Sequence, residues 1–547
     1  MATDFCLVMG QVNPVVGDVA GNVKKIIKAA EQARVEFNAD LVVFPELSLT
    51  GYPPEDLLLR PGLTKRVEKG LRKLKKKIKG VAVLVGHTAG VAREELYNAA
   101  SLIADGECLG TYFKHHLPNY GVFDEKRYFV EGKEACVIDY KGIKLGITIC
   151  EDIWFSEPAS QALDSGAEII VNLNASPFRQ GKWQLREEQV KQRAMETGLP
   201  IVYVNQVGGQ DELIFDGCSF ALSSTGEKVV RAPAWQQGLY PVIIKRNDDH
   251  TLSLQGEIAK KETELAMVYQ GLVSGLRDYV EKNNFSSVVI GLSGGIDSAL
   301  TLALAVDALG AEKVSTVMMP SRYTAQMSLD DAEEMALGLR VKHSTIAIDT
   351  LFEQFLDSLT EQFENKPVDT AEENIQARVR GVLLMAISNK TGAMVLSTGN
   401  KSEMAVGYST LYGDMAGGFS PLKDVYKTLV YQLSNYRNTI STVIPSRIIT
   451  RPPSAELAFD QLDQDSLPPY DVLDTLLERY LAEDWCFEEL VAAGADAEIV
   501  ARVIKMVDRN EYKRRQAPPG IRITRRAFGR DRRYPITSSY SVNSTID

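Results

Sequence analysis

One thirteen-residue segment constrains this chain more than any other. It runs from Val288 to Leu300 and reads V-V-I-G-L-S-G-G-I-D-S-A-L. Its apolar start predicts a buried strand of a parallel sheet, and residues 297–309 predict a helix that packs back on that sheet. The turn between them, with two glycines and two serines, exposes backbone N–H groups and hydroxyls at a helix N-terminus, where phosphate binds well. The segment therefore predicts a phosphate-binding loop.

The loop differs from the common phosphate loop of kinases and ATPases. No lysine follows its glycines, so the G-x-x-x-x-G-K-[ST] pattern is absent. Its pattern S-G-G-x-D-S resembles the ATP-pyrophosphatase loop, which holds the outer two phosphates of ATP and leaves the α-phosphate open to attack. Asp297 offers a carboxylate, the kind of ligand that Mg²⁺ prefers. A Gly-Ser turn without a ligand is the alternative, and so specific a pattern disfavours it.

Composition restricts the class of protein. At 547 residues the chain has room for three or four domain-sized units. Its apolar content of 45% is ordinary for a soluble globular protein, and its net charge of −11 argues against a protein that coats nucleic acid. The six cysteines show no C-x-x-C spacing, so neither a disulfide framework nor a zinc site is indicated. Without a signal peptide or a long apolar span, we expect a cytoplasmic protein with no membrane partner.

Strands and helices alternate through the first half of the chain. Asn22 is the expected cap of a helix that buries Val23, Ile26 and Ala30 on one face. The basic segment 65–79 predicts a solvated helix face, with an anionic-ligand patch as the less favoured alternative. Apolar runs predict buried strands at residues 5–9, 41–44, 81–86, 99–104, 142–150, 169–173 and 201–204.

Reactive groups stand at three predicted strand ends. Glu46 follows L-V-V-F-P, Lys114 follows T-Y-F, and Cys150 follows K-L-G-I-T-I. Taken singly, a buried cysteine is usually a small hydrophobe, and a lone Glu or Lys usually lies on the surface. Together, at strand ends where α/β sheets gather their chemistry, they supply a base, a cation and a nucleophile. A thiol is mostly protonated near neutral pH, so a carboxylate must take its proton, and a lysine can stabilise the developing oxyanion.

These residues lie in segments that resemble the nitrilase (carbon–nitrogen hydrolase) family. The matching segments are F-P-E-L-S-L-T-G-Y at 44–52, K-H-H-L-P-N-Y-G-V-F-D-E at 114–125 and C-E-D-I-W at 150–154, and the resemblance covers about residues 1–240. It implies a four-layer α-β-β-α sandwich in which Glu46 is the base, Lys114 stabilises the oxyanion and Cys150 forms a thioester with the amide. In glutamine-using relatives, the positions that match Tyr120, Ser176 and Lys182 contact the substrate amino acid. The resemblance therefore implies that these three residues contact the substrate here.

The second half alternates strand and helix in a different order. The polar segment 245–260 predicts a linker between an N-terminal domain, residues 1–244, and a C-terminal domain, residues 261–547. Further apolar runs predict strands at 314–319, 344–348 and from 395, with helices from Ser328 and Glu373 between them. This alternation predicts a doubly wound parallel sheet of the ATP-pyrophosphatase type, with its ligand beyond the carboxyl ends of the strands.

The C-terminal half resembles the NAD⁺ synthetase family. Beyond the phosphate loop, the resemblance rests on E-E-N-I-Q-A-R-V-R at 372–380, L-S-T-G-N-K-S-E at 396–403, G-D-M-A-G-G-F-S-P-L-K-D-V-Y-K at 413–427 and P-S-A-E-L at 453–457. It implies Mg²⁺ bound by Asp297 and Glu403, and deamido-NAD bound by Asn374, Glu403 and Lys513. It implies that ATP, a co-substrate, is bound by Ser293, Gly294, Gly295, Ile296, Asp297, Ser298, Thr398 and Lys423. The run at 413–419 departs from the loop of ammonia-only relatives, so its nicotinate contacts stay open.

A basic tail ends the chain. Residues 513–533 hold nine Lys or Arg side chains and one acid, Asp531. Such a tail could bind nucleic acid or form a disordered arm. We favour the interpretation that the resemblance implies, a segment that closes over an anionic dinucleotide, because it explains the charge without another partner.

The two halves fit one reaction. A carboxylate does not condense with ammonia in water, but transfer of AMP to the nicotinate carboxylate makes a mixed anhydride that ammonia can attack. Release of ammonia from glutamine inside the protein keeps it deprotonated and concentrated. The sequence therefore predicts a carbon–nitrogen ligase of the NAD⁺ synthetase family that takes its nitrogen from glutamine. By the same resemblance we expect at least a homodimer, with only small-molecule substrates and no nucleic acid as partner.

Two rival functions are weaker. Another amidotransferase with the same phosphate loop, of the GMP or asparagine synthetase type, would leave Asn374 and the segment 396–399 unexplained. A non-catalytic nucleotide sensor with a decayed hydrolase half is disfavoured because Glu46, Lys114 and Cys150 are all present.

Overall fold

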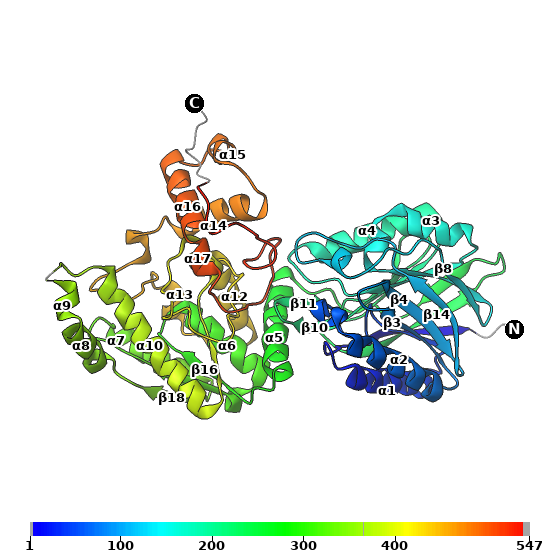
Figure 1. Ribbon diagram of the computed structural model, residues 1–547, viewed down its shortest axis with the longest axis horizontal. Coiled ribbons are helices and arrows are strands. Elements are labelled where there is room, and N and C mark those ends of the chain that lie inside the picture. The colour runs from blue at the N-terminus through cyan, green and yellow to red at the C-terminus, as the bar shows by residue number, and fades with distance from the viewer. Residues whose placement is uncertain (1–3, 365, 540–547) are drawn as a thin grey trace. The chain divides into compact units, whose positions relative to one another are not determined.

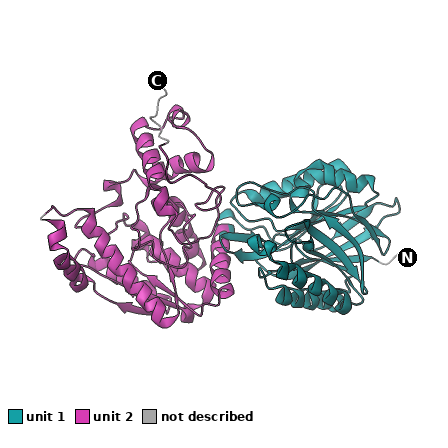
Figure 2. Cartoon of the chain, viewed as in Figure 1, with its two compact units in different colours: residues 1–267 teal, residues 268–547 magenta. Residues whose placement is uncertain are grey.

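The structure, a computed structural model, describes residues 4–364 and 366–539. It divides the chain into two compact units, Met1–Met267 and Val268–Asp547, shown in teal and magenta in Figure 2. Each unit has its own sheets (Figure 1). Each also has its own buried apolar clusters. Length alone suggested three or four domain-sized units, and the structure instead has two large ones.

Unit 1 is built on two mixed sheets whose central strands are parallel. In its described residues, the larger sheet has the order β15-β14-β1-β2-β3-β4-β5 and the smaller one β13-β12-β9-β8-β7-β6. The larger sheet consists of β15 (Leu252–Gln255), β14 (Gly238–Arg246), β1 (Phe5–Gln11), β2 (Leu41–Val43), β3 (Ala82–Gly90), β4 (Leu96–Ala104) and β5 (Glu107–Phe113). The smaller consists of β13 (Lys228–Arg231), β12 (Phe220–Leu222), β9 (Ile201–Asn205), β8 (Ile169–Asn174), β7 (Ile143–Ile149) and β6 (Val137–Tyr140). A hairpin of β10 (Val207–Gln210) and β11 (Leu213–Asp216) pairs separately.

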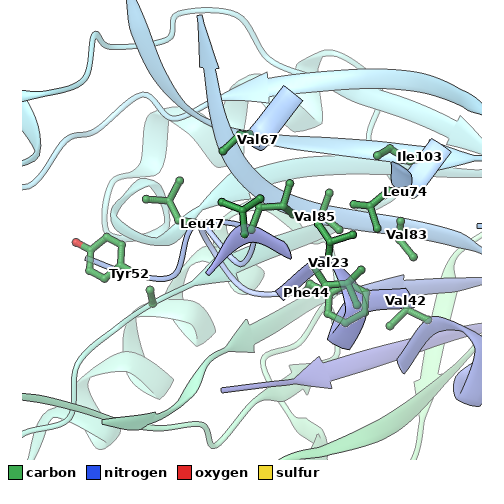
Figure 3. Close-up of a cluster of buried hydrophobic side chains, with 14 of the residues drawn as sticks. Val23, Val42, Phe44, Leu47, Tyr52, Val67, Leu74, Val83, Val85 and Ile103 are labelled. Atoms are coloured by element: carbon green, nitrogen blue, oxygen red, sulfur yellow. The ribbon is translucent and has the colours of Figure 1, made fainter. Parts of the chain in front are cut away.

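Alternation along the strands explains why unit 1 has four layers. Leu7 and Met9 of β1 pack between the two sheets, against residues such as Val171 of β8. The intervening Cys6 and Val8 face the helices α1 (Val19–Phe37) and α2 (Pro61–Lys77), whose apolar residues complete a second cluster (Figure 3). The helices α3 (Ser156–Asp164) and α4 (Lys182–Thr197) cover the outer face of the smaller sheet. The predicted α-β-β-α sandwich is therefore confirmed.

The first helix begins one turn earlier than predicted. Its cap is Asp18, whose carboxylate accepts from the backbone N–H of Gly21 at 2.9 Å. Asn22, the predicted cap, is buried inside the helix, where its amide exchanges two hydrogen bonds with the backbone of Val15 and donates to Leu49 O. Asn22 therefore ties the helix to the segment that follows Glu46. Both residue types cap helices well, so the sequence did not distinguish them.

The boundary between the units also differs from the predicted one. The sequence predicts a linker over residues 245–260, whereas the structure divides the chain after Met267, within α5 (Glu264–Lys282). Strand β14 continues to Arg246, and β15 pairs antiparallel with it at the edge of the larger sheet. Leu252 and Leu254 of β15 are buried. An edge hairpin with one solvated face is half polar, which is why this segment resembled a linker.

Unit 2 contains the predicted doubly wound sheet. Its described strands are all parallel, in the order β18-β17-β16-β19, so the strand order reverses between β16 and β19. Their bounds are β16 (Val288–Gly291), β17 (Val314–Met318), β18 (Lys342–Thr345) and β19 (Met394–Leu396). In such sheets the ligand binds at the carboxyl ends of the strands beside the reversal point. The phosphate loop follows β16, and Thr398 follows β19.

Helices surround this sheet and form a second cluster near the C-terminus. Residues of α8 (Asp349–Ser358) and α10 (Thr370–Thr391) pack on one face of the sheet. The cluster near the C-terminus is built from α11 (Lys401–Val406), α14 (Tyr470–Leu477), α15 (Phe487–Ala492) and α16 (Ala497–Arg509). Besides α5, the other described α-helices of unit 2 are α6 (Ile296–Leu309), α7 (Gln326–Gly338), α9 (Thr360–Phe363), α12 (Lys427–Ile440), α13 (Ser446–Thr450) and α17 (Glu511–Arg514). Among the described residues, no helix is both long enough and apolar enough to cross a membrane.

Candidate active sites

In unit 1, the structure brings Glu46 and Lys114 into direct contact. Lys114 Nζ donates to Glu46 Oε1 at 2.7 Å, and both side chains are fully buried. Glu46 Oε1 also accepts from Asn98 Nδ2 at 2.7 Å, and Oε2 accepts from the backbone N–H of Ala175 at 3.0 Å. These donors come from β4 and from the residues that follow β5 and β8, so the position of the carboxylate is set before any substrate binds.

Cys150 stands where β7 ends and the short 3₁₀ helix η3 (Cys150–Trp154) begins. Its φ of 46° lies in the left-handed region, an uncommon conformation for a residue with a side chain. Burial raises the pKa of the Cys150 thiol well above its usual value, the Glu46 carboxylate raises it further, and the Lys114 ammonium lowers it. The thiol is therefore protonated near neutral pH and needs a base for attack.

A second buried carboxylate, Glu125, completes this group. Its two oxygens each accept from Lys114 Nζ at 2.9 Å, and Oε1 also accepts from the Tyr52 hydroxyl at 2.9 Å. Burial raises the pKa of Glu125 to about 7; the ammonium of Lys114 opposes this shift, and the carboxylate of Glu46 adds to it. Burial would lower the pKa of Lys114, but Glu125 and Glu46 outweigh it and raise that pKa well above the usual value. The lysine therefore stays charged at neutral pH.

Sequence reasoning assigned no role to Glu125. The residue ends the matched segment 114–125 and begins the 3₁₀ helix η2 (Glu125–Arg127), after an irregular loop. Periodicity does not show where a side chain points in such a loop. The one sign of Glu125 in the sequence was its place at the end of the matched segment 114–125.

Each of the three predicted substrate contacts is linked to this group through a neighbouring residue. Ser176 lies two residues after β8 and beside Ala175, the donor to Glu46, and it is buried. The Tyr120 hydroxyl donates at 2.8 Å to Glu151, the neighbour of Cys150. Lys182 begins α4, and its ammonium lies 5.7 Å from the centre of the Phe123 ring, which in turn contacts Tyr120 edge-on.

In unit 2, the predicted phosphate loop joins β16 to α6 as strand, turn and helix. Gly294 has a φ of +80°, and a Cβ there would lie 2.4 Å from the carbonyl oxygen of Ser328, so only glycine fits. The Ser298 hydroxyl donates to Gly295 O at 3.0 Å and accepts from the backbone N–H of Ser293 at 3.2 Å. These bonds fasten the loop to the first turn of α6.

A cavity of about 550 Å³ is lined by this loop and falls in the size range of small-ligand sites. Most of the residues predicted for the synthetase site lie in its wall. They are Ser293, Gly294, Gly295, Ile296, Asp297, Ser298, Asn374, Thr398, Glu403 and Lys513. The two predicted metal-binding carboxylates, Asp297 and Glu403, are brought together by one ammonium: Lys427 Nζ donates to Asp297 Oδ2 at 2.5 Å and to Glu403 Oε1 at 3.1 Å.

The structure distinguishes two lysines that the sequence did not. Lys423, the residue expected at the ATP phosphates, is buried and is not part of the cavity wall. Its side chain packs against Gly520, where an added Cβ would lie 2.5 Å from Lys423 Cβ. Lys427, one helical turn farther on at the start of α12, lines the cavity instead. The segment before α12 is irregular, so spacing alone did not show which lysine lines the cavity.

Asn374 and Lys513 both line the cavity and are both hydrogen-bonded to the segment 407–410. Asn374 is on α10, and its side-chain oxygen accepts from the Thr410 hydroxyl at 2.8 Å. Lys513 is on α17 and donates to the carbonyl oxygens of Gly407 and Ser409 at 2.8 and 2.9 Å. Burial lowers the pKa of Lys513, and Asp414 opposes that shift.

Most of the basic tail is engaged in ion pairs within unit 2. Arg514, Arg515 and Arg532 all contact Glu511. Arg522 pairs with Asp531, and Arg526 pairs with Asp484. Lys513 is the tail residue that lines the cavity in the part of the chain that the structure describes. The charge of the tail therefore mainly folds the tail, and one lysine from it reaches the candidate site.

Comparisons with known proteins agree with both halves. Residues 7–267 match the carbon–nitrogen hydrolase family model, and residues 268–517 match the NAD synthase model. The glutamine-dependent NAD(+) synthetase of Acinetobacter baylyi is 49% identical over 98% of this chain and 99% of its own length. That of Aquifex aeolicus is 44% identical over 98% of this chain and 99% of its own length. The solved structure of glutamine-dependent NAD+ synthetase from Acinetobacter baumannii in complex with ADP is 48% identical and superposes with a TM-score of 0.80, covering 99% of this chain and 100% of that one.

Fold, sites and comparisons together define a carbon–nitrogen hydrolase module joined to an NAD synthase module in one chain. The chain belongs to the family of glutamine-dependent NAD(+) synthetases. The predicted ligase class is therefore confirmed, and the rival amidotransferase and sensor functions are not favoured.

Proposed function

We propose that unit 1 hydrolyses the side-chain amide of glutamine at Cys150. Glu46 takes the thiol proton as the sulfur attacks the amide carbon, and the ammonium of Lys114 stabilises the oxyanion of the tetrahedral intermediate. Glu46 then returns the proton to the departing nitrogen, which leaves as ammonia and a thioester at Cys150. Water attacks the thioester, its proton passes through Glu46 to the sulfur, and glutamate leaves. The contact of Lys114 Nζ with Glu46 at 2.7 Å supports these roles.

The residues around the nucleophile suit a free amino acid. The ammonium of Lys182 matches the α-carboxylate of glutamine, and Ser176 lies beside the backbone amide that holds Glu46. Tyr120 is 60% exposed and touches the neighbour of Cys150, so it can close over a bound substrate. Together these residues favour glutamine over a long or apolar amide.

We infer that unit 2 joins the ammonia to deamido-NAD. A carboxylate oxygen of the nicotinate attacks the α-phosphorus of ATP, and pyrophosphate leaves. Ammonia then attacks the activated carbonyl carbon, AMP leaves, and a proton is lost to give the amide of NAD⁺. The loop Ser293–Ser298 and Thr398 line the cavity from the ends of β16 and β19, as binding of the ATP phosphates requires. Asn374, Glu403 and Lys513 line the same cavity and are the proposed contacts of deamido-NAD.

The residues of the cavity fit a magnesium ion. Mg²⁺ is usually held by one or two carboxylates together with substrate phosphates, and Asp297 and Glu403 both contact a single cation, the ammonium of Lys427. The described residues contain no cluster of three or more His, Cys, Asp or Glu side chains around one point, so a metal here would need ligands from the phosphates. When bound, the ion would neutralise charge that develops on the pyrophosphate.

One observation carries the proposal: the chain contains both a buried base–lysine–cysteine group and a nucleotide-sized cavity lined by S-G-G-I-D-S. The test is to incubate the purified chain with ATP, Mg²⁺ and glutamine, and with deamido-NAD or aspartate as the acceptor acid. We expect AMP and NAD⁺ in equal amounts, and no AMP with aspartate. AMP formed with aspartate, or none with deamido-NAD, would contradict the proposal.

Two further expectations accompany this function. We propose at least a homodimer, supported by the exposed apolar residues of α10, where Val382 is 64% and Met385 38% exposed. Light scattering coupled to size exclusion tests it, and a monomer at micromolar concentration would contradict it. The cytoplasmic location stays a prediction that fractionation of cells tests.

A further inference from the structure

A buried carboxylate beside the candidate cysteine has no role so far. Asp152 lies two residues after Cys150, in η3, and is 0% exposed. Its Oδ1 accepts from the backbone N–H groups of His115 and His116 at 3.1 and 2.8 Å. Its Oδ2 accepts from the Tyr112 hydroxyl and from the backbone N–H of Ile149, both at 2.9 Å.

These four donors come from two different places in the fold. Tyr112, His115 and His116 lie before and after Lys114 in the sequence, at the end of β5, a strand of the larger sheet. Ile149 is the last residue of β7, a strand of the smaller sheet, and immediately precedes Cys150. One carboxylate therefore joins the segment that carries the lysine to the segment that carries the nucleophile, across the two sheets of the sandwich.

We propose that Asp152 is a positioning residue that holds Lys114 in register with Cys150. The proposal rests on the roles proposed for Lys114 and Cys150. The backbone of Lys114 is fixed on one side by β4, because its N–H donates to Asn98 O at 2.9 Å. Asp152 fixes the two residues that follow it. Without those bonds the segment after Lys114 is free to move relative to η3, and the ammonium with it.

The chemistry of the carboxylate supports this role. An ionised carboxylate accepts at both oxygens, and here all four donors are satisfied by one side chain. Asparagine has the same shape but one acceptor oxygen. Whichever way its amide turns, at least one backbone N–H, of Ile149 or of His115 and His116, then faces an NH₂ group and loses its acceptor.

The first test compares three variants that remove different numbers of these bonds. Asp152→Asn should lower kcat for ammonia release from glutamine tenfold or more, with KM for glutamine changed less than threefold. Tyr112→Phe removes one donor and no backbone bond, so it should lower kcat two- to fivefold. Asp139→Asn is the matched control, because the exposed carboxylate of Asp139 also accepts a hydrogen bond from a backbone N–H, that of Gly142 at 3.1 Å. Asp139 has no proposed role in the reaction. The control variant should match the wild type.

The second test measures whether the Lys114 ammonium still lies close to the Cys150 thiol. The charged groups around the Cys150 thiol are Glu46, Lys114, Glu151 and Glu125. Loss of the negative charge of Asp152 would by itself shift thiolate formation to lower pH, whereas withdrawal of the Lys114 ammonium shifts it to higher pH. The pH dependence of Cys150 alkylation by iodoacetamide, followed by mass spectrometry, should therefore move to higher pH in Asp152→Asn and, to a lesser extent, in Tyr112→Phe.

These outcomes separate the role of Asp152 from the proposed function. If wild-type protein releases no ammonia from glutamine, the roles of Lys114 and Cys150 fail. If wild-type protein is active, an unchanged kcat in Asp152→Asn, or an alkylation profile moved to lower pH, overturns the positioning role. Ammonium-driven synthesis should be unchanged in all three variants. If Asp152→Asn does not fold, Tyr112→Phe decides: an unchanged kcat and alkylation profile in that variant also overturn the role.

Discussion

The two candidate sites differ in how far they are built before a substrate binds. In unit 1, the side chains of Glu46 and Lys114 are 0% exposed and already paired. In unit 2, the side chains of Asp297 and Glu403 are each 17% exposed in a cavity, and their partner is a lysine of the same chain. Hydrolysis through a cysteine needs only protein groups and substrate, so its electrostatics can be fixed in advance. The proposed transfer from ATP requires the cavity to exchange the contacts of Lys427 with Asp297 and Glu403 for contacts with phosphates and the proposed metal ion.

The largest expected effect separates the two sites completely. Cys150→Ala should lower glutamine-driven NAD⁺ formation by roughly a thousandfold or more, because no other nucleophile is proposed for the amide. Ammonium-driven synthesis should stay within about twofold of the wild type, since Ser293 and Asp297 belong to the other unit. Steady-state assays with each nitrogen source check this, with exposed Cys108→Ala as the control. Glutamine use by Cys150→Ala would remove the nucleophile assignment.

The converse change should act on both nitrogen sources. Asp297→Ala removes one proposed metal ligand and leaves Lys427 with Glu403 alone. We expect synthesis from glutamine and from ammonium to fall together, on the order of a hundredfold or more, because the charge on the pyrophosphate is no longer neutralised. Release of AMP measures it. A loss confined to glutamine would mean that the two sites are not chemically separate.

A matched pair of lysines sharpens the description of the cavity. Lys427→Met should raise KM for ATP or lower kcat by roughly tenfold or more, because a charge contact inside a desolvated site is lost. Lys423→Met should change these constants less than about threefold, since Lys423 is not in the cavity wall. Kinetics with varied ATP at saturating deamido-NAD check the pair. The opposite ranking would restore Lys423 as the phosphate contact.

Another lysine of the same cavity wall, Lys513, tests the choice of acceptor. Lys513→Ala removes an ammonium that lines the cavity from α17. A desolvated charge contact is worth about 1.5–3 kcal/mol, so kcat/KM for deamido-NAD should fall roughly ten- to a hundredfold. Glutamine hydrolysis measured without nucleotides should barely change. Unchanged constants for deamido-NAD would show that Lys513 only anchors Gly407 and Ser409.

The smallest effect concerns pH and the buried group of unit 1. Burial raises the pKa of Glu125 from the ordinary value of 4.5 to about 7, so the folded chain holds this proton more tightly than the unfolded chain. This proton therefore adds to the free energy of unfolding, by roughly 3 kcal/mol at most. The contribution is fully present below pH 4.5 and is lost as the pH rises through about 7. Glu125→Gln, which mimics the protonated acid, should match the wild type in Tm at pH 5 and gain on it at pH 8. A constant difference between the two pH values, with exposed Glu95→Gln as control, would contradict the shift.

The sequence located candidate site residues best where the backbone is regular. Glu46, Lys114, Cys150 and the phosphate loop all come shortly after strands, and α/β sheets gather their functional groups at strand ends. Two differences between the predictions and the structure are four residues in size: Asp18 caps the first helix instead of the predicted Asn22, and Lys427 lines the cavity where Lys423 was expected. In each case two chemically suitable residues stand four positions apart beside an irregular segment, and only tertiary packing selects between them.

Other features had no periodic signal at all. Glu125 reaches Lys114 through an irregular loop, and Asp152 acts through backbone N–H groups that carry no mark in the sequence. The edge strand β15 was hidden by its solvated face. Such features follow from long-range contacts, which local propensity and spacing do not encode.

The most direct measurement follows the nitrogen atom from one site to the product of the other. The chain is supplied with ATP, Mg²⁺, deamido-NAD and glutamine labelled with ¹⁵N in its side-chain amide, and the NAD⁺ is analysed by mass spectrometry. We expect the label in the carboxamide of NAD⁺, one AMP for each NAD⁺, and no labelled product from Cys150→Ala. NAD⁺ that forms without the label, or labelled NAD⁺ from Cys150→Ala, would contradict the division of labour between the two units.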